Sequence, residues 1–85
     1  MDEQFDLRPL LDYIDPASCS YTEWAQVGMA LKHEGYSVSD WDQWSQRDGA
    51  RYHTGECERK WRTFKEEAGS VVTGATITQM AKDAG

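Results

Sequence analysis

The 85-residue sequence contains no long hydrophobic run. No stretch approaches the roughly 20 apolar residues that a membrane-spanning helix requires. The acidic start, MDEQFD, has neither the basic region nor the apolar region of a signal peptide. We therefore expect a cytoplasmic protein with no membrane partner.

Cysteine is also scarce, because the chain has only Cys19 and Cys57. Two cysteines make a poor disulfide framework. His53 and Cys57 are four residues apart, but Cys19 has no second cysteine nearby with which to form the usual zinc-ligand pair. We expect packed, reduced thiols and no metal ion, with Cys57 acting as a small hydrophobe on a helix rather than as a nucleophile.

Motifs of the common enzyme classes are missing. The chain has no glycine-rich phosphate loop, no G-x-S-x-G and no H-E-x-x-H. Its acidic residues are scattered rather than paired among apolar neighbours that would perturb them. We therefore expect no catalytic residue and no cofactor in this chain, and predict a non-catalytic domain.

Apolar residues recur at helical spacing along the whole chain, which predicts an all-α fold. The strongest helix opens with Ser20-Tyr-Thr-Glu23, a capping box in which the two end side chains each satisfy a backbone N–H. Gly35 supplies a left-handed stop, and Gly28 marks a close helix crossing. The inner stripe of this helix is Trp24, Val27, Gly28 and Leu31.

Four further apolar stripes predict four further helices: Leu7, Leu10, Leu11 and Ile14; Val38, Trp41 and Trp44; Cys57, Trp61, Phe64 and Ala68; Ile77, Met80, Ala81 and Ala84. The expected N-caps are Asp6, Ser37 or Ser39, Thr54, and Thr73 or Thr76. The expected stops of the first three are Asp15-Pro16, Gly49 and Gly69. Val71-Val72 alone has short strand character. Residues 1–85 are thus predicted to form one domain, a compact bundle of about five short helices.

Positive charge is scarce overall and concentrated locally. The chain has 9 Lys+Arg against 15 Asp+Glu, a net charge of −6, yet residues 47–65 hold six cations and three acids, a net charge of +3. One interpretation is a solvated helix with the i,i+4 pairs Glu56–Lys60, Glu58–Arg62 and Arg62–Glu66. The other is a surface that follows the phosphates of a nucleic acid.

An exposed ring beside these cations would stack on an unpaired base. Trp24, Trp41 and Trp61 fall on inner stripes and are expected in the core. Trp44 lies at the edge of its stripe and Tyr52 lies in a connection, so these two are the candidates for stacking. The predicted nucleic-acid-binding residues are Trp44, Arg47, Arg51, Tyr52, Arg59, Arg62 and Lys65.

Three segments also resemble the motifs of one family: Y-x-E-W-x-x-V-G-M-A-L at residues 21–31, W-x-x-W-S at 41–45 and E-C-x-x-K-W-x-x-F at 56–64. With the closing segment TGATITQMAKDAG, they resemble the primase C-terminal domain of the second type. This small helical module is found in phage, plasmid and mobile-element replication proteins. The resemblance covers nearly the whole chain.

The resemblance implies an accessory domain of a DNA primase or primase-helicase. Its expected neighbours are a primase-polymerase domain before it and a helicase after it. The implied role is to help hold single-stranded DNA template, with the initiating nucleotide as a further option, beside the catalytic domain. The alternative is a docking or spacer domain between primase and helicase that does not contact nucleic acid.

Overall fold

The structure, a computed structural model, describes residues 7–64 and 73–84, in which every regular element is a helix. The elements are α1 (Arg8–Leu11), the short 3-10 helix η1 (Pro16–Ser18), α2 (Tyr21–His33), α3 (Val38–Ser45), α4 (Glu56–Trp61) and α5 (Gly74–Ala84). The predicted all-α bundle of about five short helices is confirmed. None of the helices in the described ranges is long and apolar enough to cross a bilayer.

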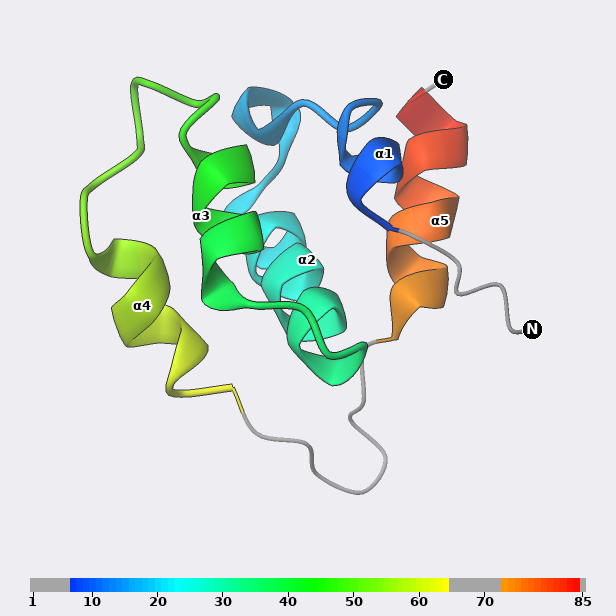
Figure 1. The fold of residues 1–85 in the computed structure, drawn as a ribbon. Coiled ribbons are helices and arrows are strands. Elements are labelled where there is room, and N and C mark those ends of the chain that lie inside the picture. Colours follow the sequence, from blue (N-terminus) through cyan, green and yellow to red (C-terminus); the bar gives the residue numbers. More distant parts are fainter. Residues whose placement is uncertain (1–6, 65–72, 85) are drawn as a thin grey trace.

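Helix α2 is the centre of the bundle. It packs on α3 and α4 on one side and on α5 on the other, while α3 also contacts α4 and α1 lies against α5 (Figure 1). The two ends of the described chain, α1 and α5, therefore lie together, and the α3–α4 pair forms the opposite side of the domain.

The predicted limits of α2 are confirmed. Ser20 Oγ accepts from the Glu23 N–H at 3.1 Å, and Glu23 Oε1 accepts from the Ser20 N–H at 2.8 Å. These two bonds satisfy donors that have no partner within the helix. At the other end Gly35 has φ +91°, and the Tyr36 N–H donates to Leu31 O at 2.9 Å.

The limits predicted for α3 and α4 are partly wrong. Ser37 precedes α3 as expected, but the helix ends at Ser45 rather than at Gly49 because tighter turns follow, with the Arg47 and Asp48 N–H groups bonded to Trp44 O and Ser45 O. Helix α4 is preceded by Gly55, at φ +86°, and not by the expected cap Thr54. It ends at Trp61, so Phe64 lies in the turn that follows; Ala68 and Gly69 lie outside the described residues.

The outer helices also differ slightly from expectation. Leu7 occupies the N-cap position of α1 with no side-chain bond, and the predicted cap Asp6 lies outside the described residues. Thr73 caps α5 as predicted, since its Oγ1 accepts from the Ala75 N–H at 3.3 Å. Ala84, expected on the inner stripe of α5, is exposed at the helix end, and the Val71-Val72 segment lies outside the described residues.

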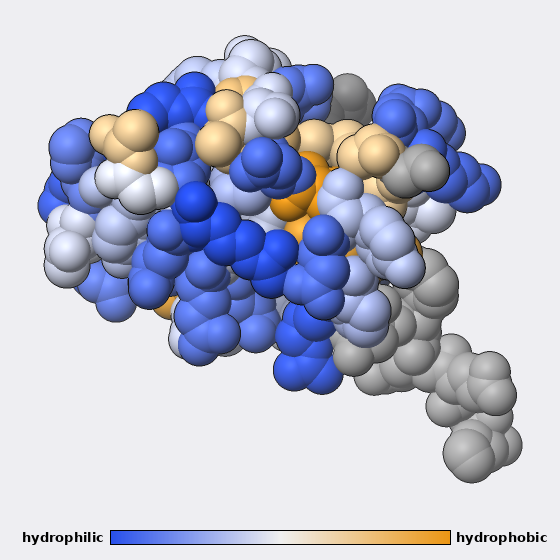
Figure 2. Space-filling model, turned by 90° about the horizontal axis from the view of Figure 1, so that it is seen from above, coloured by the Kyte–Doolittle hydropathy of each residue, from blue (hydrophilic) through white to orange (hydrophobic). Residues whose placement is uncertain are grey.

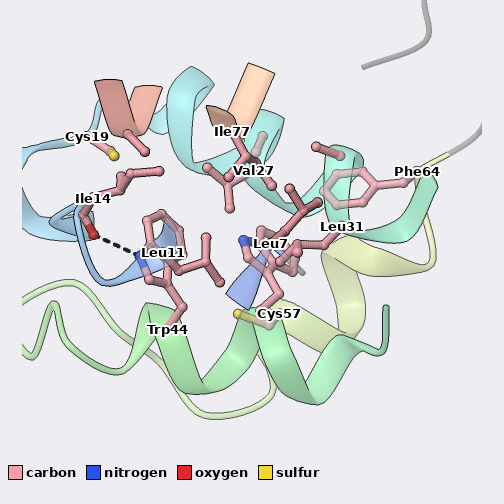
Figure 3. Close-up of a cluster of buried hydrophobic side chains, with 14 residues drawn as sticks. Leu7, Leu11, Ile14, Cys19, Val27, Leu31, Trp44, Cys57, Phe64 and Ile77 are labelled. Carbon is pink, nitrogen blue, oxygen red and sulfur yellow. Dashed lines mark hydrogen bonds between the residues drawn. The ribbon is translucent and has the colours of Figure 1, made fainter. Parts of the chain in front are cut away.

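Tryptophan rings fill the core. Trp41 and Trp44 are its two largest fully buried side chains. Figure 3 shows Trp44 among aliphatic residues from the other helices. Three indole N–H groups have a partner, because Trp44 donates to Ile14 O at 2.9 Å, Trp41 to Trp24 O at 3.2 Å and Trp24 to Ser45 Oγ at 2.8 Å. These bonds remove the cost of burying a polar group and fix how the rings are oriented.

Polar residues cover most of the outside. On the face seen from above, hydrophilic residues dominate; the most hydrophobic colour lies in a small area near the centre, and weakly hydrophobic residues are scattered around it (Figure 2). Within the described residues, Tyr13 and Tyr21 are the exposed large hydrophobic side chains, at 62% and 58%.

Gly28 allows α2 to approach α3 and the turn after α4. A Cβ built on Gly28 would lie 2.6 Å from Trp41 Cε2 and 2.8 Å from Phe64 Cε2. Trp41 is fully buried and Phe64 nearly so, so neither ring has room to move aside. The close crossing predicted at this glycine is confirmed.

We therefore expect Gly28→Ala to destabilise the fold by about 1–3 kcal/mol through overpacking, even though alanine is the better helix former. Urea unfolding followed by tryptophan fluorescence measures this. The matched control is Gly49→Ala, because Gly49 has an ordinary φ and no atom within 4 Å of a built Cβ. If the Gly28→Ala variant were as stable as the unmodified domain, the Trp41 and Phe64 rings would be able to move aside, which would contradict this prediction.

Candidate nucleic-acid interface

The basic connection between α3 and α4 is fastened to the body of the domain by Arg51. Its Nη2 donates to Pro16 O at 2.8 Å, to Ala17 O at 3.3 Å and to Cys19 O at 2.8 Å, and its Nε donates to Asp48 Oδ2 at 2.5 Å. The guanidinium thus closes the end of η1 and holds the connection beside it. Arg51 was predicted to bind phosphate, but most of its N–H donors are bonded within the chain.

Arg47 is similarly engaged on another side of the domain. Its Nη2 lies 2.5 Å from Asp12 Oδ1, and its Nη1 donates to Leu11 O at 3.3 Å. A cation beside the carbonyls at the end of α1 is favourably placed. Arg47 therefore ties α3 to α1 and does not join the other predicted cations at one site.

The two predicted stacking rings differ in position. Trp44 is 2% exposed and bonded to Ile14 O, so the stacking role predicted for it conflicts with the structure: the ring belongs to the core. Tyr52 is half-buried, and its hydroxyl lies 2.9 and 3.1 Å from the two carboxylate oxygens of Asp42. This hydrogen bond raises the pKa of the Tyr52 phenol, because it stabilises the protonated form beside a negative charge.

Of the cations predicted to bind nucleic acid, two in the described residues remain uncommitted, one on α4 and one at its C-cap. Arg59 and Arg62 are exposed, and neither guanidinium has an ion pair within residues 7–64 and 73–84. The predicted pairs Glu56–Lys60 and Glu58–Arg62 are not formed there. Lys60 lies with its Nζ 5.3 Å from the Tyr21 ring centroid, a cation–π contact. Lys65 and Glu66 lie outside the described residues.

A pocket of about 330 Å³ opens between the start of α2, the end of α3 and the connection to α4. We call it the Tyr21 pocket; the lining residues that matter below are Tyr21, Trp24, Tyr52, His53, Glu56 and Cys57. Tyr21 is an exposed ring that was not among the residues predicted from the sequence. The signal was present in the sequence, because the residue directly after the cap Ser20 falls off the inner stripe of α2.

Cys57 lies at the buried end of this pocket lining. It is 1% exposed and its thiol donates to Ser45 Oγ at 3.4 Å. Burial raises the pKa of the Cys57 thiol to about 11, since the thiolate would lose its hydration. Cys19 is buried as well, and both thiols are free.

Arg51→Lys should lower the free energy of unfolding by about 1–2 kcal/mol, because an ammonium does not reproduce the planar fork that reaches three carbonyls and a carboxylate. The loss of stability is modest because the Arg51 side chain is 53% exposed and solvent screens its ion pair. Urea unfolding followed by circular dichroism measures it. Arg62→Lys is the control and should change stability by less than about 0.5 kcal/mol; equal effects would contradict the fastening role.

The Cys57 thiol should resist alkylation in the folded protein at neutral pH. A pKa of about 11 leaves only about one molecule in ten thousand as thiolate there, and reactivity rises as the pH approaches that value. The Cys19→Ala variant isolates Cys57, and the rate of reaction with iodoacetamide is compared with and without urea. Rapid alkylation of the folded variant at neutral pH would contradict this placement.

Comparison with curated proteins and with solved structures gives no significant match. Comparison with protein families gives one: residues 7–81 match the family described as Primase C terminal 2. The match runs from the first described residue into α5 and so spans the whole bundle. The chain belongs to the Primase C terminal 2 family, and is thereby an accessory part of a primase.

Proposed function

We propose that this domain helps to hold single-stranded DNA template beside the catalytic domain of its parent primase, through the cationic side of α4. The observation that carries the proposal is the pair Arg59 and Arg62, exposed and without an ion pair in the described residues. An uncommitted guanidinium binds phosphate well because its fork of donors matches two phosphate oxygens.

The surroundings of this pair support the same function. Lys60 lies next to the arginines on α4, and Lys65, although outside the described residues, belongs to the same +3 segment. Tyr21 and Tyr52 line the adjacent pocket and present aromatic surface for a base. Because Arg47 and Arg51 are engaged within the chain, the proposed phosphate contacts are Arg59, Lys60, Arg62 and Lys65.

The proposed neighbours are a primase-polymerase domain and a helicase of the same replication protein. They supply the catalytic groups, while this domain supplies a contact to the strand. A net charge of −6 opposes the approach of DNA to the isolated domain. Weak binding alone and stronger binding within the parent protein are therefore expected.

Fluorescence anisotropy of a labelled single strand, measured at several salt concentrations, tests the proposal. Affinity should fall with rising salt, with a log–log slope of about −0.7 per neutralised phosphate. Arg59→Glu and Arg62→Glu should each weaken binding and make the slope shallower. Lys82→Glu, which makes the same charge change on α5, is the matched control.

Two results would overturn the proposal. One is undetectable binding at low salt, and the other is an equal loss with Lys82→Glu, which would reveal only a net-charge effect. If Arg59→Glu in the parent protein instead releases the neighbouring domains and leaves template affinity intact, the domain is a docking module.

A further inference from the structure

The Tyr21 pocket has the size and walls of a site for one planar ring system. Its volume of about 330 Å³ lies at the small end of the range of about 300–1,000 Å³ found for small-molecule sites. Tyr21, Trp24, Tyr52 and His53 all contribute rings to its lining. The Tyr21 and Trp24 centroids are 5.4 Å apart with their planes tilted by 42°, and Tyr21 is 58% exposed. An exposed ring leaves aromatic surface on which a flat guest can stack.

The polar atoms of the pocket add a preference. The Glu56 carboxylate lines it, is half-buried, and has no hydrogen bond or ion pair in residues 7–64 and 73–84. A carboxylate accepts hydrogen bonds and has none to donate. It therefore suits a base edge with an exocyclic amino group, such as that of cytosine, and faces the carbonyl oxygens of thymine unfavourably.

Positively charged side chains also lie at the Tyr21 pocket. The Lys60 ammonium is 5.3 Å from the centroid of Tyr21, a ring that lines the pocket, and the Arg51 side chain also lines it. A base that enters the pocket brings its own phosphate close to the Lys60 ammonium, whereas most donors of Arg51 are engaged within the chain. An apolar side chain of a protein partner would gain nothing from them and would leave Glu56 without a donor.

We propose that the Tyr21 pocket holds one unpaired nucleobase with an exocyclic amino group, stacked on the aromatic wall and bonded to Glu56. This inference rests on the proposed function and deepens it, because it gives the strand contact a base preference. The same base chemistry is carried by a template strand and by a free nucleotide, which the test must separate.

The test is a titration of the ¹⁵N-labelled domain with dCMP and, separately, with TMP. dCMP should shift the backbone signals of the pocket and the Trp24 indole N–H signal, and TMP should bind about tenfold more weakly. Equal binding of the two nucleotides, or shifts away from the pocket, would overturn the inference.

Two variants with matched controls extend the test. Tyr21→Ala should lower dCMP affinity about tenfold through lost stacking, whereas Tyr13→Ala removes an equally exposed ring outside the pocket and should leave it unchanged. Glu56→Gln should narrow the preference for dCMP over TMP, while Glu58→Gln on the same helix should keep it. A preference unaffected by Glu56→Gln would contradict the assigned hydrogen bond.

Oligonucleotides separate the two sources of the base. If the site serves a strand, oligo(dC) binds more tightly than both dCMP and oligo(dT). If dCMP enters the pocket and no oligonucleotide binds, the pocket inference stands for a free nucleotide and the template function fails. If oligo(dC) and oligo(dT) bind alike with a normal salt slope and dCMP does not shift the pocket, the template function stands and the pocket inference fails.

Discussion

The close approach of α2 to Trp41 and Phe64 at Gly28 is the contact on which the rest of the domain depends. With no Cβ in the way, Trp41 comes near enough to the α2 backbone for its indole N–H to donate to Trp24 O. The Trp24 and Phe64 rings then pack on Trp41 at centroid distances of 4.4 and 5.3 Å. One ring thus joins α2 and α3 to the turn after α4, which explains why such short helices hold together without a disulfide.

Most charged side chains near this cluster form hydrogen bonds with backbone groups at helix ends. The Lys32 ammonium reaches Trp61 O and Phe64 O at 2.8 and 3.1 Å, where α4 ends, and the Glu34 carboxylate accepts from the Gly74 N–H at 2.8 Å, where α5 begins. Each charge meets a helix end of the opposite partial charge. Arg51 likewise closes η1. In the described residues Arg59 on α4 and Arg62 at its C-cap are left exposed without an ion pair, so the surface proposed to meet an anion is a consequence of how the core is closed.

Features that depend on neighbouring residues could be predicted from the sequence. Side-chain positions that depend on residues far along the chain could not. The Ser20–Glu23 cap and the inner stripe of α2 require only neighbours, and they are confirmed. Trp44 lies at the edge of its stripe, where periodicity leaves the side chain's direction open, and a carbonyl 30 residues away fixes it. The carbonyl partners of Arg51 lie 32 to 35 residues away and could not be predicted from spacing. Its carboxylate partner Asp48 is only three residues away, so that ion pair had a local signal that the prediction did not use. The pocket was not foreseen, because it exists only once α2, α3 and the connection are packed together.

The phosphate contacts and the pocket would respond differently to their surroundings. Counterion release makes the arginine contacts weaken steeply with salt, whereas stacking and a hydrogen bond to a base edge depend on it little. If both proposals hold, the pocket would carry a larger share of the selectivity at physiological ionic strength, while the cations would mainly orient the strand. A net charge of −6 would also repel DNA from most of the surface of the domain, which would confine the proposed encounters to the cationic side of α4. That confinement suits an accessory domain, since a contact that is weak but fixed in place positions a strand without preventing its movement.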